Sequence, residues 1–176
     1  ERVAYLGRED NWWGPAGETG PCGPDTEVFY WVPNDIDPPA KFDPSDDRWM
    51  EIWNNVFMEY NKTSGGDFEP LDQKNVDTGM GLERVLVLLN GLENVYQTDL
   101  FKDLILWLGE DTPGNRIFAD HIRAAVFLIA DGVRPSNNER GYVLRRLIRR
   151  AIIKRRNLEL DYLALEVISM YRDQYP

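Results

Sequence analysis

The stretch "NVDTGMGLERV", residues 75–85, joins a carboxylate, two glycines and an arginine to the start of a leucine-rich segment. Glycines here are typical of a strand-to-helix turn that needs unusual backbone angles, with Asp77 or Thr78 near the helix start. This interpretation does not account for Arg84, because a cation in the first turn of a helix opposes the helix dipole. An anionic ligand accounts for Arg84, and an ammonium group accounts for Asp77. A dinucleotide loop is disfavoured because the third glycine of that motif is missing.

The segments around this stretch predict an α+β fold. "TEVFYWV", residues 26–32, and "RWMEIWNNVFMEYNK", residues 48–62, are typical of strands. The loop between them predicts antiparallel pairing, because a parallel crossover normally needs a helix. Gly and Pro predict irregular backbone at residues 11–25, a turn at 63–70 and a break near 113–115. Helices are predicted at residues 82–91, 99–109, 116–132 and 140–156, followed by a final amphipathic helix.

Asn54 lies within the second predicted strand. Alternation places it on one face with apolar side chains and places Glu51 on the other face. A polar amide on an apolar face needs partners, so Asn54 is either a satisfied core residue or a contact to a small polar ligand. The loop before the first strand offers Trp12 and Trp13 as pocket walls. It also offers candidates for polar or metal contacts that the sequence does not distinguish: Glu18, Asp25 and Glu27.

Composition narrows the class of protein. The chain has 176 residues, of which 43% are hydrophobic and 28% are charged, so we expect a packed core in one domain or in one domain and part of another. No apolar run approaches the roughly 18 residues that a membrane span needs. The single cysteine, Cys22, excludes an internal disulfide, and one Cys with one His leaves no zinc-site spacing. We therefore expect a cytoplasmic location, no membrane partner and no zinc.

Charge is distributed unevenly along the chain. Residues 140–156 contain eight of the 20 basic residues and no acidic residue, which leaves 12 basic against 30 acidic residues elsewhere. A solvated helix face normally mixes signs, so this cationic face favours a nucleic-acid backbone over a merely solvated surface. Its cations include Arg145, Arg146, Arg149 and Arg150. Asn137 and Asn138 precede the helix, either as caps or as amides that read base edges.

Four blocks of the sequence resemble successive blocks of the alanyl-tRNA synthetase family, which belongs to class II. They are "NWWGPAGETGPCGPDTEVFYW", "EIWNNVFMEYNK", "NVDTGMGLERV" and "RIFADHIRAAVFLIADGVRPSNNERGYVLRRLIRRA", and they cover most of residues 11–151. The resemblance implies a partial class II antiparallel sheet with flanking helices in residues 1–112, the C-terminal part of the catalytic domain. It implies that residues 113–176 begin an all-α tRNA-recognition domain. The reaction would activate alanine with ATP and Mg²⁺, then transfer it to the acceptor end of tRNA(Ala).

The resemblance also implies site residues. The catalytic residues would be Arg84 and Asp77, with Arg84 and Gly81 binding ATP. The alanine site would comprise Trp13, Asn54, Asp77 and Gly79, with Asn54 and Trp13 near the substrate carboxylate and side chain. The tRNA contacts would be Asn137, Asn138, Arg145, Arg146, Arg149 and Arg150.

The chain departs from the family pattern at two positions and lacks some of its parts. The family often has a second cysteine and a histidine where Asp25 and Phe29 stand here. The first two class II motifs and the editing domain are not visible, so we expect a fragment that does not form the adenylate alone. The alternative is a non-catalytic RNA-binding module that uses the basic helix 140–156. A regulatory nucleotide binder is a weaker third hypothesis.

Overall fold

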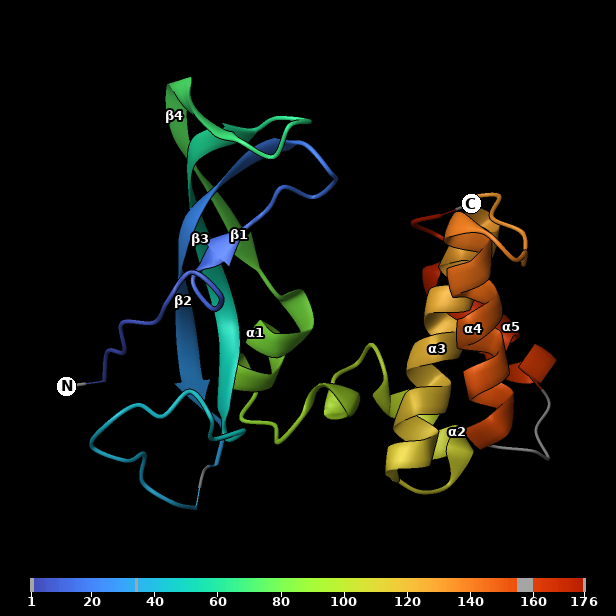
Figure 1. The fold of residues 1–176 in the computed structure, drawn as a ribbon. Helices are drawn as coiled ribbons and strands as arrows, with labels where there is room; N and C mark the ends of the chain where they lie inside the picture. The colour runs from blue at the N-terminus through green and yellow to red at the C-terminus, as the bar shows by residue number, and fades with distance from the viewer. Residues whose placement is uncertain (1, 34, 155–159, 176) are drawn as a thin grey trace. The chain divides into compact units, whose positions relative to one another are not determined.

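The computed structural model describes residues 2–33, 35–154 and 160–175. The chain forms two compact units, Glu1–Val95 and Tyr96–Pro176. The first unit contains a four-stranded antiparallel sheet followed by one helix, and the elements described in the second unit are helices (Figure 1).

The sheet of the first unit has the strand order β1-β2-β3-β4, and all neighbouring strands are antiparallel. Its strands are β1 (Trp12–Trp13), β2 (Gly20–Trp31), β3 (Trp49–Lys62) and β4 (Phe68–Met80), and α1 (Leu82–Leu89) follows β4 directly. The predicted strands and their antiparallel pairing are therefore confirmed.

The irregular backbone expected at residues 11–25 is wrong over most of its length. Residues 12–13 form β1, and residues 20–25 form the first half of β2. The turn expected at 63–70 also ends early, because β4 begins at Phe68. Main-chain hydrogen bonds hold β1 to β2, and they hold both the first half of β2 and β4 to β3. Such bonds form without an alternating apolar pattern.

The central strand β3 buries one face. Val56 and Met58 are 5% and 6% exposed, whereas Trp53 and Phe57 on alternate positions are exposed, as the alternation predicts. The register then shifts: Val28 pairs with Trp53, but Phe29 pairs with Glu51, so Ile52 is an extra residue in β3. A bulge of this kind turns the residues beyond it to the other face of the sheet. Glu51 therefore lies on the same face as Asn54, and the expectation that the two lie on different faces is wrong.

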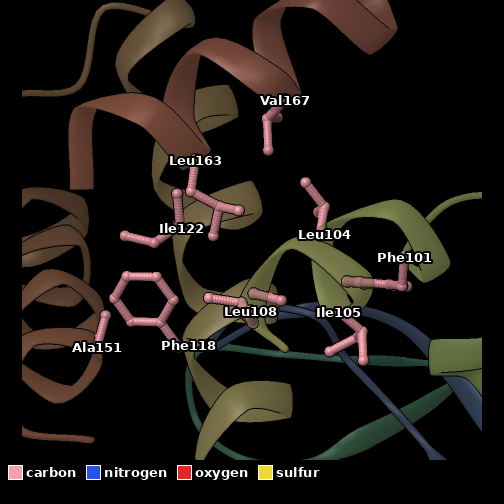
Figure 2. Packing of buried hydrophobic residues seen from close by; sticks show 10 residues of the cluster. Phe101, Leu104, Ile105, Leu108, Phe118, Ile122, Ala151, Leu163 and Val167 are labelled. Carbon is pink, nitrogen blue, oxygen red and sulfur yellow. The ribbon is translucent and has the colours of Figure 1, made fainter. Parts of the chain in front are cut away.

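The second unit is built from helices around one apolar cluster. They are α2 (Lys102–Leu108), α3 (Pro113–Ala130), α4 (Glu139–Lys154) and α5 (Leu160–Tyr171), and the 3₁₀ turn η1 (Val95–Gln97) spans the division between the units along the chain. Figure 2 shows the cluster, in which the Phe118 ring of α3 lies beside Ala151 of α4 and Leu163 of α5 points toward Ile122. Phe118, Ala151 and Leu163 are fully buried.

The expected chain break at residues 113–115 is wrong, because these residues form the first turn of α3. Thr112 is the N-cap, and its hydroxyl accepts a hydrogen bond from the Asn115 backbone N–H at 3.2 Å. Proline at the first position of a helix is favourable because that N–H has no partner within the helix in any case.

The division into compact units falls between Val95 and Tyr96, earlier than the boundary expected after residue 112. Phe101, Leu104 and Leu108 belong to the same buried cluster as Phe118, which places α2 with the helices that follow it. The assignment of residues 1–112 and 113–176 to catalytic and tRNA-recognition domains stays a prediction.

Candidate functional site

Strand register gathers polar residues on one face of the sheet. Asn54 of β3 lies opposite Glu27 of β2 and Gly79 of β4. One pair further along, Val56 lies opposite Asp25 and Asp77. Side chains directly opposite each other in antiparallel strands share a face, so the expected alanine residues Asn54, Asp77 and Gly79 face the same side.

Asn54 is half-buried and has a carboxylate partner. Its amide nitrogen Nδ2 donates to Oδ2 of Asp25 at 3.3 Å. Asp25 is only 8% exposed, and its other oxygen, Oδ1, is buried with no hydrogen-bond partner among the residues that the structure describes. Asn54 is therefore partnered, as a polar residue on a partly buried face requires.

Two further carboxylates, Glu27 and Glu51, lie close to this pair. Burial raises the pKa of Glu27 above its ordinary value of 4.5, and the charges of Glu51 and Asp25 raise it further. A hydrogen bond from the Asn54 side chain and the charge of Arg84 act in the opposite direction on this pKa. The Ile52 bulge brings Glu51 to this face, where its charge acts on Glu27.

Arg84 lies in the first turn of α1, just after the strand that bears Asp77 and Gly79. Its NH1 donates to the backbone oxygen of Glu51 at 2.8 Å and to Oε2 of the same residue at 2.9 Å. These bonds fix the guanidinium against β3 while the side chain stays 47% exposed. Both bonds use one terminal nitrogen, so the group retains donors for an anion.

The two glycines of the opening motif do not have unusual backbone angles. Neither Gly79 nor Gly81 has a positive φ, and Gly81 is the N-cap of α1 at φ −73°. A Cβ at Gly81 would lie 3.3 Å from Cδ of Arg84, so the glycine leaves room for that side chain. A Cβ at Gly79 would meet no atom of the described residues within 4 Å, which leaves open space above the sheet. Asp77 and Thr78 lie within β4 and do not cap the helix.

Two cavities of the first unit border this face. One, of about 960 Å³, is lined by Arg84, Glu51, Trp49 and Phe29 among others. The other, of about 990 Å³, includes Asp25 and Glu27 and shares Phe29 and Trp49 with the first. Both volumes fall within the range of about 300–1,000 Å³ that is usual for small-molecule sites.

Trp13 lies away from the other expected alanine residues along the sheet. It is in β1 opposite Gly23, four residues from the Glu27 that faces Asn54, and it is 40% exposed. Its neighbour Trp12 stacks on Tyr60, and the guanidinium of Arg8 lies 4.0 Å from the centre of the Trp12 ring. A role for Trp13 in the alanine site stays a prediction.

The basic helix is present as α4, which begins at Glu139 and is described as far as Lys154; the expected positions 155 and 156 lie outside the described residues. Leu144 and Ala151 are buried, whereas Val143 and Ile152 of the expected apolar half are 51% and 42% exposed. Three expected tRNA contacts are exposed: Arg146, Arg149 and Arg150.

The loop before α4 places the two asparagines differently. Asn137 is exposed, and its Oδ1 accepts a hydrogen bond from NH1 of Arg145, so this arginine is tied to the loop. The backbone oxygen of Asn138 accepts from the Tyr142 N–H at 3.0 Å, which places Asn138 at the start of the helix. The Oγ of Ser136 donates to the same oxygen at 2.9 Å. Asn138 therefore caps the helix through its backbone oxygen and not through its side chain. The side chains of Asn137 and Asn138 are both exposed.

Three functional candidates could not be placed from the sequence. Asp25 and Glu27 were indistinguishable from Glu18, and Glu51 was assigned to the wrong face. The i, i+2 spacing of Asp25 and Glu27 was the available signal for the first pair, since it places both on one face of a strand. For Glu51 no local signal existed, because the bulge depends on the partner strand.

Comparison with known proteins adds independent findings. The family model for tRNA synthetases class II (A) matches residues 1–176. An alanine–tRNA ligase of Treponema pallidum is 43% identical over 99% of this chain and 32% of its own length. Those of Idiomarina loihiensis and Methylobacillus flagellatus are 47% and 51% identical over 86% of this chain, and 18% and 19% of their own lengths. The chain spans about a third or less of the length of these curated relatives.

Proposed function

The chain belongs to the class II (A) tRNA synthetase family, and we propose that the protein of which it is part is an alanine–tRNA ligase. In this proposal alanine and ATP form alanyl-adenylate and pyrophosphate, and the alanyl group then passes to the acceptor end of tRNA(Ala). A cytoplasmic location belongs to the same proposal, since translation uses the product there. Among the described residues, no helix is long and apolar enough to cross a membrane.

The observation that supports this proposal most directly is the single face shared by Asn54, Asp77 and Gly79, which leads into Arg84 at the start of α1. Asp77 is exposed on β4 and offers a carboxylate to the ammonium group of alanine. Arg84 offers a fixed cation to the ATP phosphates, and Gly81 leaves room for its side chain.

The chemistry assigned to these residues is mainly positioning and charge stabilisation. The alanine carboxylate attacks the α-phosphorus of ATP, an acyl–phosphate bond forms, and the bond to pyrophosphate breaks. Arg84 would stabilise the negative charge that grows on the phosphate oxygens, while Asp77 would hold the amine so that the carboxylate points at phosphorus. The cavity that Arg84 lines is large enough for the nucleotide.

Mg²⁺ is implied by the use of ATP. The described residues contain no group of three or more His, Cys, Asp or Glu side chains that could hold a metal ion. Mg²⁺ usually binds through one or two carboxylates together with substrate phosphates, so a complete protein cage is not needed. When bound with ATP it would neutralise phosphate charge, and the roles given to Asp77 and Arg84 do not depend on it.

The test of this proposal is alanine-dependent ATP–pyrophosphate exchange by the full-length protein. We expect exchange with alanine and a loss of about 100-fold or more in Arg84→Ala, since a charge that stabilises the transition state is removed. Arg172→Ala, an exposed arginine near the C-terminus of the chain, is the matched control and should exchange normally. Exchange that does not depend on alanine would refute the proposal.

A second candidate function, RNA binding without catalysis, is supported by the exposure of Arg146, Arg149 and Arg150 on α4. The two functions can be separated by measuring binding to an acceptor-stem hairpin with a G·U wobble pair and to the same hairpin with a G·C pair. Preference for the wobble supports base reading at Asn137 or Asn138 in the ligase. Equal binding with no exchange activity in the full-length protein would favour the non-catalytic module.

A further inference from the structure

Asp25 is a buried carboxylate that the proposed reaction does not use. It is 8% exposed, its Oδ2 is bound to Asn54, and its Oδ1 has no partner among the described residues. Burying a carboxylate oxygen without a hydrogen bond costs free energy. Stability therefore does not explain why a carboxylate stands at this position. Its hydrogen bond to Asn54 indicates that it acts on the Asn54 side chain.

The Asp25 carboxylate on β2 holds the Asn54 amide. A carboxamide has two N–H donors and one oxygen acceptor. Nδ2 donates to Oδ2 of Asp25 at 3.3 Å, and Glu27 lies directly opposite Asn54 on β2. Because Nδ2 faces Asp25 of β2, the amide oxygen Oδ1 is turned away from that carboxylate.

We propose that Asp25 is a positioning residue that holds the Asn54 carboxamide so that its oxygen accepts a hydrogen bond from the ammonium group of the amino-acid substrate. This inference rests on the proposed function, which identifies that substrate as alanine. Asp77 lies opposite Val56 on the same face, so the ammonium group would meet the Asn54 oxygen and the Asp77 carboxylate together. A substrate carboxylate at Asn54 would instead face an oxygen and be repelled.

The kinetic test uses the full-length protein and a double-mutant cycle. Asp25→Ala should raise KM for alanine about tenfold, the effect of releasing one charge-assisted hydrogen bond, with kcat and KM for ATP nearly unchanged. In an Asn54→Ala background Asp25→Ala should have no further effect, because it acts through Asn54. Asp25→Asn keeps an acceptor for the amide and should restore most of the affinity. Independent effects of the two alanine substitutions, or an Asp25→Asn variant as impaired as Asp25→Ala, would overturn the proposal.

Two inhibitors identify the substrate group that Asn54 contacts. Alaninamide keeps the amine and lacks the carboxylate, whereas lactate keeps the carboxylate and lacks the amine. Asp25→Ala should raise the inhibition constant of alaninamide by the same factor as the KM for alanine. It should leave the inhibition constant of lactate unchanged. The reverse result would place the substrate carboxylate at Asn54 and overturn the assignment.

A spectroscopic readout separates this proposal from the ligase function. In protein labelled with ¹⁵N-asparagine, the side-chain amide signals of Asn54, identified by their loss in Asn54→Ala, should exchange slowly with solvent. Asp25→Ala should speed this exchange, and Asp25→Asn should not. Rapid exchange in the wild type would overturn the positioning role even if alanine is activated. Slow exchange with no alanine activation would refute the ligase function alone. The melting temperature of Asp25→Asn should not fall, since the substitution keeps an acceptor for the Asn54 amide.

Discussion

Arg84 is bonded to the sheet and also keeps hydrogen-bond donors for an anionic ligand. Two hydrogen bonds to Glu51 tie its guanidinium to β3, although it stands where the helix dipole of α1 disfavours a cation. The Glu51 carboxylate compensates part of that cost. Arg84 is therefore held in place before any ligand arrives, which is the condition for electrostatic stabilisation without reorganisation.

Glu27 makes stability depend on pH. Its folded-state pKa is raised above 4.5, chiefly by burial and then by Glu51 and Asp25, so the folded chain binds this proton more tightly than the unfolded chain does. The stabilisation from this proton is complete below pH 4.5 and is lost as pH rises through the folded-state pKa. Glu27→Gln should therefore raise the melting temperature at neutral pH, and the difference should shrink as pH falls toward 4.5. Thermal unfolding across this pH range checks the prediction, and Glu9→Gln on an exposed segment is the control. An equal difference at every pH would contradict it.

At the scale of elements, β2 and β3 approach so closely that one position admits only glycine. A Cβ at Gly23 would lie 1.8 Å from the backbone oxygen of Phe57. The clash is with main chain, so it can be relieved only by moving a strand. This contact lies at the register shift between Cys22 and Asp25, just before the residues that hold Asn54.

Gly23→Ala should lower the free energy of unfolding by about 1–3 kcal/mol, the usual cost of forcing an extra carbon into a packed site. Gly79→Ala is the matched control, since it is also a strand glycine but no atom of the described residues lies within 4 Å of its added carbon. Denaturant unfolding of both variants checks the prediction. Equal stability of the two would mean that β2 moves aside without cost.

The N-terminus of α3 depends on one side-chain cap. Thr112 Oγ accepts the Asn115 backbone N–H, and this helix supplies much of the buried cluster of the second unit. Thr112→Ala should destabilise the fold by about 1 kcal/mol, whereas Thr112→Ser keeps the acceptor and should have little effect. Urea unfolding followed by circular dichroism measures both, and an equally damaging serine would exclude the cap as the cause.

At the scale of the whole molecule, charge is separated along the sequence. The chain has a net charge of −10, yet residues 140–156 carry eight basic residues and no acidic one. A negative protein repels nucleic acid at long range, so a cationic helix has to supply the local attraction. Arg146, Arg149 and Arg150 are exposed and would supply this attraction in the proposed function, whereas Arg145 is bound to Asn137.

This separation predicts how RNA binding depends on salt. Removing Arg149 and Arg150 should weaken binding of an acceptor-stem hairpin and reduce the slope of log affinity against log salt by about 0.7 to 0.9 for each arginine. The control Lys102→Ala removes an exposed cation from α2 and should leave the slope unchanged. Binding isotherms at several salt concentrations give the slope, and an unchanged slope in the arginine variants would show that this face is only solvated.

The sequence by itself determined the local elements and the chemical types available for a site. Helical periodicity located α1 through α4, alternation located β3, and the motif predicts Asp77, Asn54 and Arg84 as site residues. These features depend on residues close in sequence, whose spacing sets which side of a helix or strand each occupies.

Only the tertiary structure decided which of those residues meet. It paired β1 with β2 and β4 with β3 through backbone bonds that need no apolar pattern, and it turned Glu51 toward the Asn54 face through the bulge at Ile52. It also buried Asp25 beside the Asn54 amide. The physical reason is that register is set between strands distant in sequence, and a single extra residue in one strand reverses the face of everything beyond it.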